Sequence, residues 1–172
     1  MTLLVSDANV LLDLEIGGLI EHLFDQAFDC VVPDVLYYEE LEEQHAHLLD
    51  LGLGVRELDG EGVELVEVLV DRYRGVSRND CLALALARME DIPLLTGDKD
   101  LRGAARSEEV EVVGSIWVID ELVLSKSISS GQARQAYDAM REAQRRLPWD
   151  EALRHLEEIE AGTLAPRDPF SR

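Results

Sequence analysis

Short apolar runs alternate with amphipathic helical patterns along most of the chain, and this alternation limits the fold more than any other feature. Each run is bounded by a proline, a glycine or a charged residue, as buried strands usually are. The runs expected to form strands are 3–6, 30–33, 92–96 and 110–114. Strands that alternate with helices are typical of an α/β fold with a parallel sheet.

The helical patterns lie between these runs and after the last of them. The expected helices are 17–28, 34–50, 61–74, 78–90, 99–107, 115–128, 131–147 and 149–161. The only candidate linker, 52–60, is too short to separate two domains. Residues 162–172 contain two prolines and no periodic pattern, so we expect this tail to fray.

The charge balance is strongly acidic. Of the 172 residues, 36 are Asp or Glu and 16 are Lys or Arg, which gives a formal net charge of −20. This excludes a nucleic-acid binder that works through a basic surface. Only two of the basic residues are lysines, Lys99 and Lys126, and we hypothesise that so acidic a surface suits a salty cell interior, where charge repulsion is screened.

Hydrophobic residues make up 47% of the chain, which argues against disorder. The two cysteines, Cys30 and Cys81, cannot form a disulfide framework, which fits a reducing cytoplasm. We expect both side chains to be buried in the protein core as small apolar residues. The N-terminus has no signal-peptide pattern, and no apolar stretch is long enough for a membrane span. The sequence therefore predicts a cytoplasmic protein that does not enter a membrane.

Acidic residues fall at positions that a parallel sheet would bring together. Asp7 directly follows an expected strand, and Asp98 follows the segment PLLTG in the same way. Asp80 begins an apolar helix, and Glu39 and Glu40 lie in the helix after the second strand. Ligands of open α/β sheets bind at the carboxyl ends of the strands. Carboxylates gathered there would repel one another unless cations neutralise them, and Mg²⁺ and Mn²⁺ prefer oxygen ligands.

Each of these residues also has a purely structural interpretation. Asp7 and Asp98 are of a type favoured at helix N-caps, and Asp80 forms a near-capping box with Ser77. Glu40 lies in the run EELEE, which is typical of a solvated helix face. Only the four positions taken together, and no single one of them, therefore indicate a site.

Five segments carry a family resemblance: SDANVLLDL, VVPDVLYYEEL, SRNDCLALALAR, PLLTGDKDLR and VEVVGSIWVIDELVLSKSIS. In this order and spacing they resemble the PIN domain, in particular the VapC-like ribonuclease toxins and a PIN subgroup with a longer helical C-terminus. The resemblance implies an α/β fold, a PIN-like three-layer α/β/α sandwich around a central parallel sheet. It further implies a PIN-like domain at 1–130 and a helical C-terminal extension at 131–161, packed on the same core.

The resemblance also implies an activity, the metal-dependent hydrolysis of RNA to leave a 5′-phosphate. The implied catalytic carboxylates are Asp7, Glu40, Asp80 and Asp98, with Glu39 as the alternative to Glu40. Mg²⁺ or Mn²⁺ would be held by Asp7, Asp80 and Asp98, and would lower the pKa of the attacking water. Asn9 and Thr96 match positions that orient such ligands, while Arg78 and Arg102 flank the site and are candidates for contacting substrate phosphate.

A toxin of this kind would act on RNA as a homodimer and would be bound by an antitoxin. A basic antitoxin peptide would complement the acidic surface of this chain. The alternative is a catalytically weak PIN-like module that regulates through partner binding. Two other α/β classes fit less well: a phosphoacceptor receiver needs adjacent acidic residues at the first strand, and a dehalogenase-like phosphatase needs Asp-x-Asp where this chain has Asp7-Ala8-Asn9. We expect all four histidines to lie at the surface, namely His22, His45, His47 and His155, so no histidine-activated nucleophile is predicted.

Overall fold

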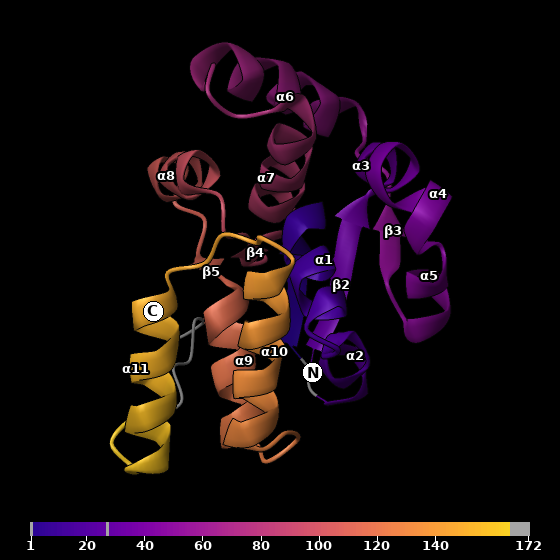
Figure 1. Ribbon diagram of the computed structural model, residues 1–172. Helices are drawn as coiled ribbons and strands as arrows, with labels where there is room; N and C mark the ends of the chain where they lie inside the picture. Colours follow the sequence, from indigo (N-terminus) through magenta and orange to yellow (C-terminus); the bar gives the residue numbers. More distant parts are fainter. Residues whose placement is uncertain (1, 27, 166–172) are drawn as a thin grey trace.

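A five-stranded parallel sheet forms the centre of the computed structural model, which describes residues 2–26 and 28–165 (Figure 1). The strands lie in the order β3-β2-β1-β4-β5, and each neighbouring pair is parallel. Their bounds are Thr2–Ser6 for β1, Phe28–Pro33 for β2, Gly54–Arg56 for β3, Leu94–Leu95 for β4 and Val112–Val113 for β5. The α/β class with a parallel sheet is thus confirmed.

Helices cover the sheet in two layers. Figure 1 shows α6, α7 and α8 on one side of the sheet and α9, α10 and α11 on the other, while α1 contacts α9 and α10. On the first side the bounds are α6 Gly60–Arg72, α7 Arg78–Glu90 and α8 Lys99–Ser107. The others are α1 Ala8–Ile16, α2 Ile20–Gln26, α9 Ser115–Leu124, α10 Ser130–Glu142 and α11 Trp149–Glu160. A helical segment follows β2 in four pieces: α3 Asp34–Leu36, the π-helical turn η1 Tyr37–Leu41, α4 Glu42–His45 and α5 His47–Leu51.

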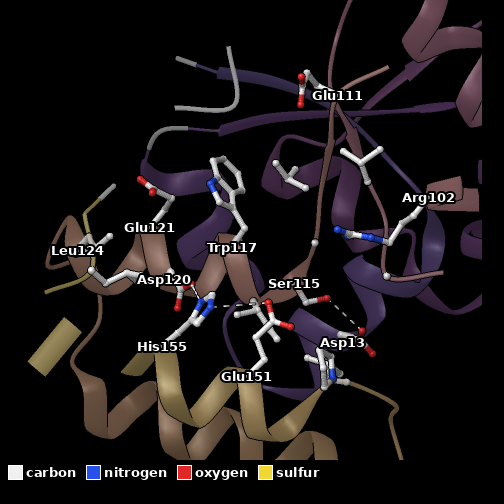
Figure 2. Close-up of a pocket in the computed structure, with 18 of the residues that line it drawn as sticks. Asp13, Arg102, Glu111, Ser115, Trp117, Asp120, Glu121, Leu124, Glu151 and His155 are labelled. Atoms are coloured by element: carbon white, nitrogen blue, oxygen red, sulfur yellow. Dashed lines mark hydrogen bonds and ion pairs between the residues drawn. The ribbon is translucent and has the colours of Figure 1, made fainter. Parts of the chain in front are cut away.

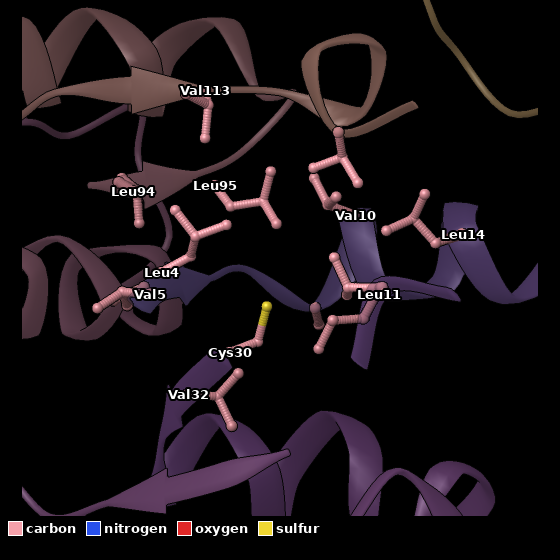
Figure 3. Packing of buried hydrophobic residues seen from close by; sticks show 14 of the residues in the cluster. Leu4, Val5, Val10, Leu11, Leu14, Cys30, Val32, Leu94, Leu95 and Val113 are labelled. Carbon is pink, nitrogen blue, oxygen red and sulfur yellow. The ribbon is translucent and has the colours of Figure 1, made fainter. Parts of the chain in front are cut away.

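The core lies where β1 and its neighbours meet the helices. Leu4 and Val5 of β1 are fully buried and pack among Cys30 of β2 and Leu94 and Leu95 of β4 (Figure 3). On the helical side, residues 81–87 of α7 are buried without interruption, because all of them are Cys, Leu or Ala and the helix contacts β1, β2 and β4. Both cysteines are buried, as the sequence predicts.

Strand β3 and helix α1 both differ from the sequence-based expectation. Strand β3 lies inside the segment 52–60 that was expected to be a loop; it is three residues long and lacks the apolar run that marks a strand. Its Gly54 meets β2 closely, since an added Cβ would stand 2.8 Å from Cγ1 of Val31. Helix α1 begins at Ala8, before the first expected helix at 17–28, and Gly17 and Gly18 separate it from α2.

The expectation that every histidine lies at the surface is wrong for His155. This side chain is 6% exposed, and its Nδ1 lies 2.6 Å from Oδ2 of Asp120. Because Asp120 belongs to α9 and His155 to α11, the pair satisfies two buried polar groups and joins the two helices.

The C-terminal helices pack on the rest of the chain: α10 contacts α1 and α9, and α11 contacts α9 and α10. After α11, residues 163–165 have no regular structure, and the remainder of the tail expected to fray, 166–172, lies outside the described residues. Of the helices that the structure describes, none combines the length and apolar character needed to cross a lipid bilayer.

Candidate active site

Asp7 stands at the junction between the central strand β1 and helix α1. Its Oδ1 accepts a hydrogen bond from the backbone nitrogen of Val10 at 2.9 Å and so caps the helix. Its Oδ2 accepts from the hydroxyl of Thr96 at 2.5 Å. The carboxylate is 1% exposed, so Asp7 is a helix cap and a member of the acidic cluster at once.

Burial raises the pKa of Asp7 to about 7. The hydrogen bonds from Thr96 and Val10 oppose this shift, and the charges of Asp80 and Asp13 add to it. Both hydrogen-bond donors are uncharged, so they stabilise the carboxylate less than an arginine or a cation would. Asp7 is therefore a buried acid whose ionisation at neutral pH is costly in the absence of added positive charge.

Asp98 follows β4, the neighbour of β1, and caps α8 through a 2.7 Å hydrogen bond from the nitrogen of Leu101. The hydroxyl of Thr96 links the two strand ends. It donates to Asp7 and accepts a hydrogen bond from the backbone nitrogen of Asp98 at 3.1 Å. A single hydroxyl is thus hydrogen-bonded to the side chain of Asp7 and to the backbone of Asp98.

Asp80 lies in the first turn of α7, where Ser77 caps the helix by accepting from the nitrogen of Asp80 at 3.1 Å. Burial raises the pKa of Asp80, and the charges of Asp98 and Glu40 raise it further. Since Asp80 in turn raises the pKa of Asp7, these four carboxylates form one electrostatically coupled cluster at the carboxyl edge of the sheet.

The glutamates come from the π-helical turn η1 after β2, and such one-residue expansions recur at functional sites. The side-chain amide of Asn79 donates to Oε2 of Glu39 at 2.9 Å and to Oε1 of Glu40 at 2.7 Å. Sequence reasoning missed Asn79, although it lies in the same SRND segment as Asp80. Of the two glutamates, only Glu40 is among the main groups that raise the pKa of Asp80.

The remaining sequence-predicted residues lie around this cluster in different settings. Asn9 is exposed and its Oδ1 accepts from Nη2 of Arg145 at 3.2 Å, so its amide contacts the segment after α10. Arg78 forms an exposed ion pair with Glu67 of α6 at 2.7 Å. Arg102 is half-buried and its Nη1 donates to the carbonyl oxygen of Thr96 at 2.9 Å, beside the link between Asp7 and Asp98.

The donor set has the chemistry that a hard divalent cation prefers, because every candidate ligand is a carboxylate oxygen. Such an ion would lower the free-energy cost of ionising the buried carboxyl of Asp7. Among residues 2–26 and 28–165, however, no group of three His, Cys, Asp or Glu side chains is arranged so that it could hold a metal ion.

The protein is therefore an α/β protein with a parallel sheet and a cluster of carboxylates at the carboxyl ends of its strands. The model of the family DUF3368, a PIN domain, matches residues 3–161, and the chain belongs to this PIN-domain family. Membership confirms the PIN-like fold and indicates nuclease activity on a nucleic-acid substrate.

Among solved structures, the chain is similar to a PilT N-terminus domain protein from the hyperthermophilic archaeon Sulfolobus solfataricus P2. The two share 18% sequence identity and a TM-score of 0.46 over 75% of this chain and 95% of that one. Among curated proteins there is no match.

Proposed function

We propose that this protein is a Mg²⁺- or Mn²⁺-dependent endoribonuclease whose catalytic carboxylates are Asp7, Glu40, Asp80 and Asp98. The observation that carries the proposal is the buried carboxylate of Asp7, whose pKa is raised to about 7 and which is coupled to Asp80. A buried carboxylate of this kind stabilises a bound cation more than an exposed carboxylate does. The reason is that the cation offsets the desolvation free energy of the buried negative charge.

In this proposal Asp7, Asp80 and Asp98 hold the metal, and Glu40 completes the acidic cluster. When bound, the metal supplies a water of lowered pKa and stabilises the departing 3′-oxygen. Thr96 keeps Asp7 and Asp98 oriented through its two hydrogen bonds. Arg102 and Arg78 bind the backbone phosphates of the substrate.

The net charge of −20 sets the conditions under which RNA can approach. Repulsion between the protein and the phosphate backbone is screened by salt, so we expect cleavage to improve with ionic strength before it declines. The same charge favours a basic peptide as a partner. We therefore propose that the protein is the cytoplasmic toxin of a toxin–antitoxin module, VapC-like and homodimeric, and that a basic antitoxin segment inhibits it.

The test is cleavage of a mixed RNA by the purified protein with Mg²⁺, with Mn²⁺ and with EDTA, at low and at molar KCl. The substitutions Asp7→Asn, Asp80→Asn and Asp98→Asn are each expected to abolish metal-dependent cleavage. Asp100→Asn is the matched control for Asp98→Asn, because Asp100 is exposed two residues further along α8. Equal cleavage by the wild type and the three variants would refute the proposed centre.

The partner-binding alternative has one observation in its favour. Both oxygens of Asp7 already accept hydrogen bonds from the protein, and the described side chains are not arranged around an ion. If no salt condition yields metal-dependent cleavage, while a basic peptide binds and Asp7→Asn leaves that binding intact, the protein is a binding module and not a nuclease.

A further inference from the structure

A cavity of about 450 Å³ lies beside the acidic cluster, between β5, α9, α11 and residues 146–148 (Figure 2). This volume is within the range of small-ligand pockets, about 300–1,000 Å³. The proposed chemistry uses none of its walls except Arg102. Two of its walls, α9 and α11, are joined by the buried Asp120–His155 pair.

The cavity reaches the chain segment that carries the proposed catalytic residue Asp98. Gly97 lines it and stands between Thr96 and Asp98 in the chain, so its Cα lies about 3.8 Å from each of theirs. Arg102 also lines it while donating to the carbonyl oxygen of Thr96. An added Cβ at Gly114 would stand 3.0 Å from Nη1 of Arg102, so a small residue at 114 leaves room for this guanidinium.

One wall of the cavity is aromatic. Trp117 of α9 is half-buried and lines the cavity. Its ring is held by an edge-to-face contact with Phe28, with a centroid distance of 5.3 Å. Figure 2 shows Trp117 and Arg102 on different sides of the cavity, with Glu151 below them. An aromatic wall and a nearby cation are the usual partners of an unstacked base and its phosphate.

The acidic lining decides which part of a nucleotide the cavity suits. Asp13 is paired with Arg145 at 2.5 Å, and Asp120 with His155 at 2.6 Å. Glu151, an exposed residue of α11, lies 3.8 Å from Nε2 of His155 and retains acceptor capacity. A carboxylate repels phosphate but accepts hydrogen bonds from a base. Guanine alone among the four RNA bases offers two adjacent N–H donors on its Watson–Crick edge, and these match both oxygens of one carboxylate.

We propose that the cavity binds the guanine base of an unpaired nucleotide adjacent to the scissile phosphate, which gives the nuclease a preference for guanine at that position. Trp117 stacks on the base, Glu151 accepts from its N1–H and N2–H groups, and Arg102 binds the phosphate between this nucleotide and the cluster. The specificity part of this inference rests on the proposed nuclease function, whereas recognition of guanine itself is independent of it.

Nucleotide binding tests the inference without catalysis. Tryptophan fluorescence of the full-length Trp149→Phe protein, in EDTA, would be titrated with GMP, guanosine, IMP, AMP, CMP and UMP. GMP is expected to bind at least about tenfold more tightly than AMP, CMP or UMP. IMP, which lacks the N2 amino group, is expected to bind about tenfold more weakly than GMP. Equal affinity for all nucleotides would overturn the inference.

Matched variants locate the site. In the same background, Glu151→Gln is expected to weaken GMP about tenfold and to remove the advantage of GMP over IMP. Glu157→Gln, an exposed change on the same helix, is expected to leave both affinities within twofold. Because Trp117 reports the signal, Trp117→Leu and Trp117→Phe are measured by calorimetry: the Leu variant loses GMP binding and the Phe variant retains most of it. GMP affinity unchanged by both Glu151→Gln and Trp117→Leu would also overturn the inference.

Mapping of cleavage sites separates this inference from the proposed function. Cleavage that depends on Asp98 and favours one guanine position, with that bias lost in Glu151→Gln, supports both. Asp98-dependent cleavage without base preference leaves the nuclease standing and refutes the specificity role of the cavity. Selective GMP binding without any cleavage refutes the nuclease and leaves a guanine-binding pocket.

Discussion

Two buried carboxylates, Asp7 at the edge of the sheet and Glu108 at the end of α8, differ in whether their hydrogen-bond donors carry a positive charge. Asp7 is 1% exposed and Glu108 is 9% exposed. Asp7 accepts hydrogen bonds from a hydroxyl and a backbone amide. Glu108 accepts from Arg72 at 2.5 Å, from Arg88 at 2.5 Å and from the hydroxyl of Tyr73 at 2.6 Å.

The pKa values move in opposite directions as a result. Burial raises the pKa of Asp7 to about 7. Burial is also the largest single influence on Glu108, but the hydrogen bonds from Tyr73 and Arg72 and the charges of Arg72 and Arg88 outweigh it and lower its pKa. Glu108 is thus the centre of an ion-pair cluster that joins α6, α7 and α8. The ionised carboxylate of Asp7, by contrast, has no charged partner among its hydrogen-bond donors, and a bound cation would lower the free-energy cost of its ionisation.

The largest expected effect comes from Asp7→Asn. For a pKa of 3.8 in the unfolded chain and about 7 in the folded one, the folded state binds the proton more tightly. Stability is therefore lost as pH rises from about 4 to 7, by up to about 4 kcal/mol. Asn carries no charge, so we expect the variant to be more stable than the wild type at pH 8 and similar to it near pH 4. It should nevertheless lose cleavage by roughly a thousandfold.

Urea unfolding at pH 5 and pH 8 in EDTA measures this difference, and Mn²⁺ sharpens it. The metal is expected to stabilise the wild type at pH 8 and to leave Asp7→Asn unchanged. A wild type that is equally stable at both pH values, with no response to Mn²⁺, would contradict the assignment of Asp7 as the uncompensated acid.

Glu108→Gln should produce the next largest effect, and on stability only. Breaking a buried ion pair costs about 3–5 kcal/mol. Because Arg72 and Arg88 are about half exposed, at 52% and 43%, we expect about 2 kcal/mol. The pKa of Glu108 is lowered by folding, so its contribution is present at neutral pH and is lost as pH falls below about 4.5.

Thermal melts of Glu108→Gln at pH 7 and pH 4 check this expectation. The difference from the wild type should be large at pH 7 and should shrink at pH 4. Asp71→Asn, an exposed change on α6 next to Arg72, is the control and should melt like the wild type. Loss of RNA cleavage by Glu108→Gln well below its melting temperature would show that the two regions are not separate.

The contrast between the two regions also explains what the sequence could predict. Runs such as 3–6 and 30–33 predicted the strands because buried parallel strands are apolar without interruption. Asp7 was found because it directly follows such a run, and Asp98 because it lies two residues after one. The three-residue β3 carries no such signal, and the burial of His155 depends on Asp120, 35 residues away. Asn79 was missed for the same reason, since its partners Glu39 and Glu40 are 40 and 39 residues away.

Thr96→Val tests the hydroxyl that joins Asp7 to Asp98. The substitution removes a donor to one carboxylate and an acceptor for the backbone nitrogen of the other. Loss of a residue that orients metal ligands usually costs about 10–100-fold in activity or metal affinity. Since the Thr96 hydrogen bond lowers the pKa of Asp7, the rise of cleavage with pH should also move to higher pH.

Thr96→Ser keeps the hydroxyl and should restore both the rate and the pH profile. A merely structural role would lower stability in Thr96→Val without moving the pH profile. Cleavage rates from pH 5 to 9 for the three proteins distinguish these outcomes, and an unchanged profile in Thr96→Val would contradict the role assigned to the hydroxyl.

The smallest effects are expected at the two glutamates of η1, which differ in one respect. Both accept from Asn79, but only Glu40 is among the main groups that raise the pKa of Asp80. Glu40→Gln should therefore lower cleavage about tenfold and move the pH profile slightly to lower pH, because Asp80 loses a negative neighbour. Glu39→Gln should stay within twofold of the wild type. The same assay run on both variants decides between them. A larger loss of cleavage in Glu39→Gln than in Glu40→Gln would assign the catalytic glutamate to Glu39. It would also mean that Asn79, which donates to both side chains, orients Glu40 away from the cluster.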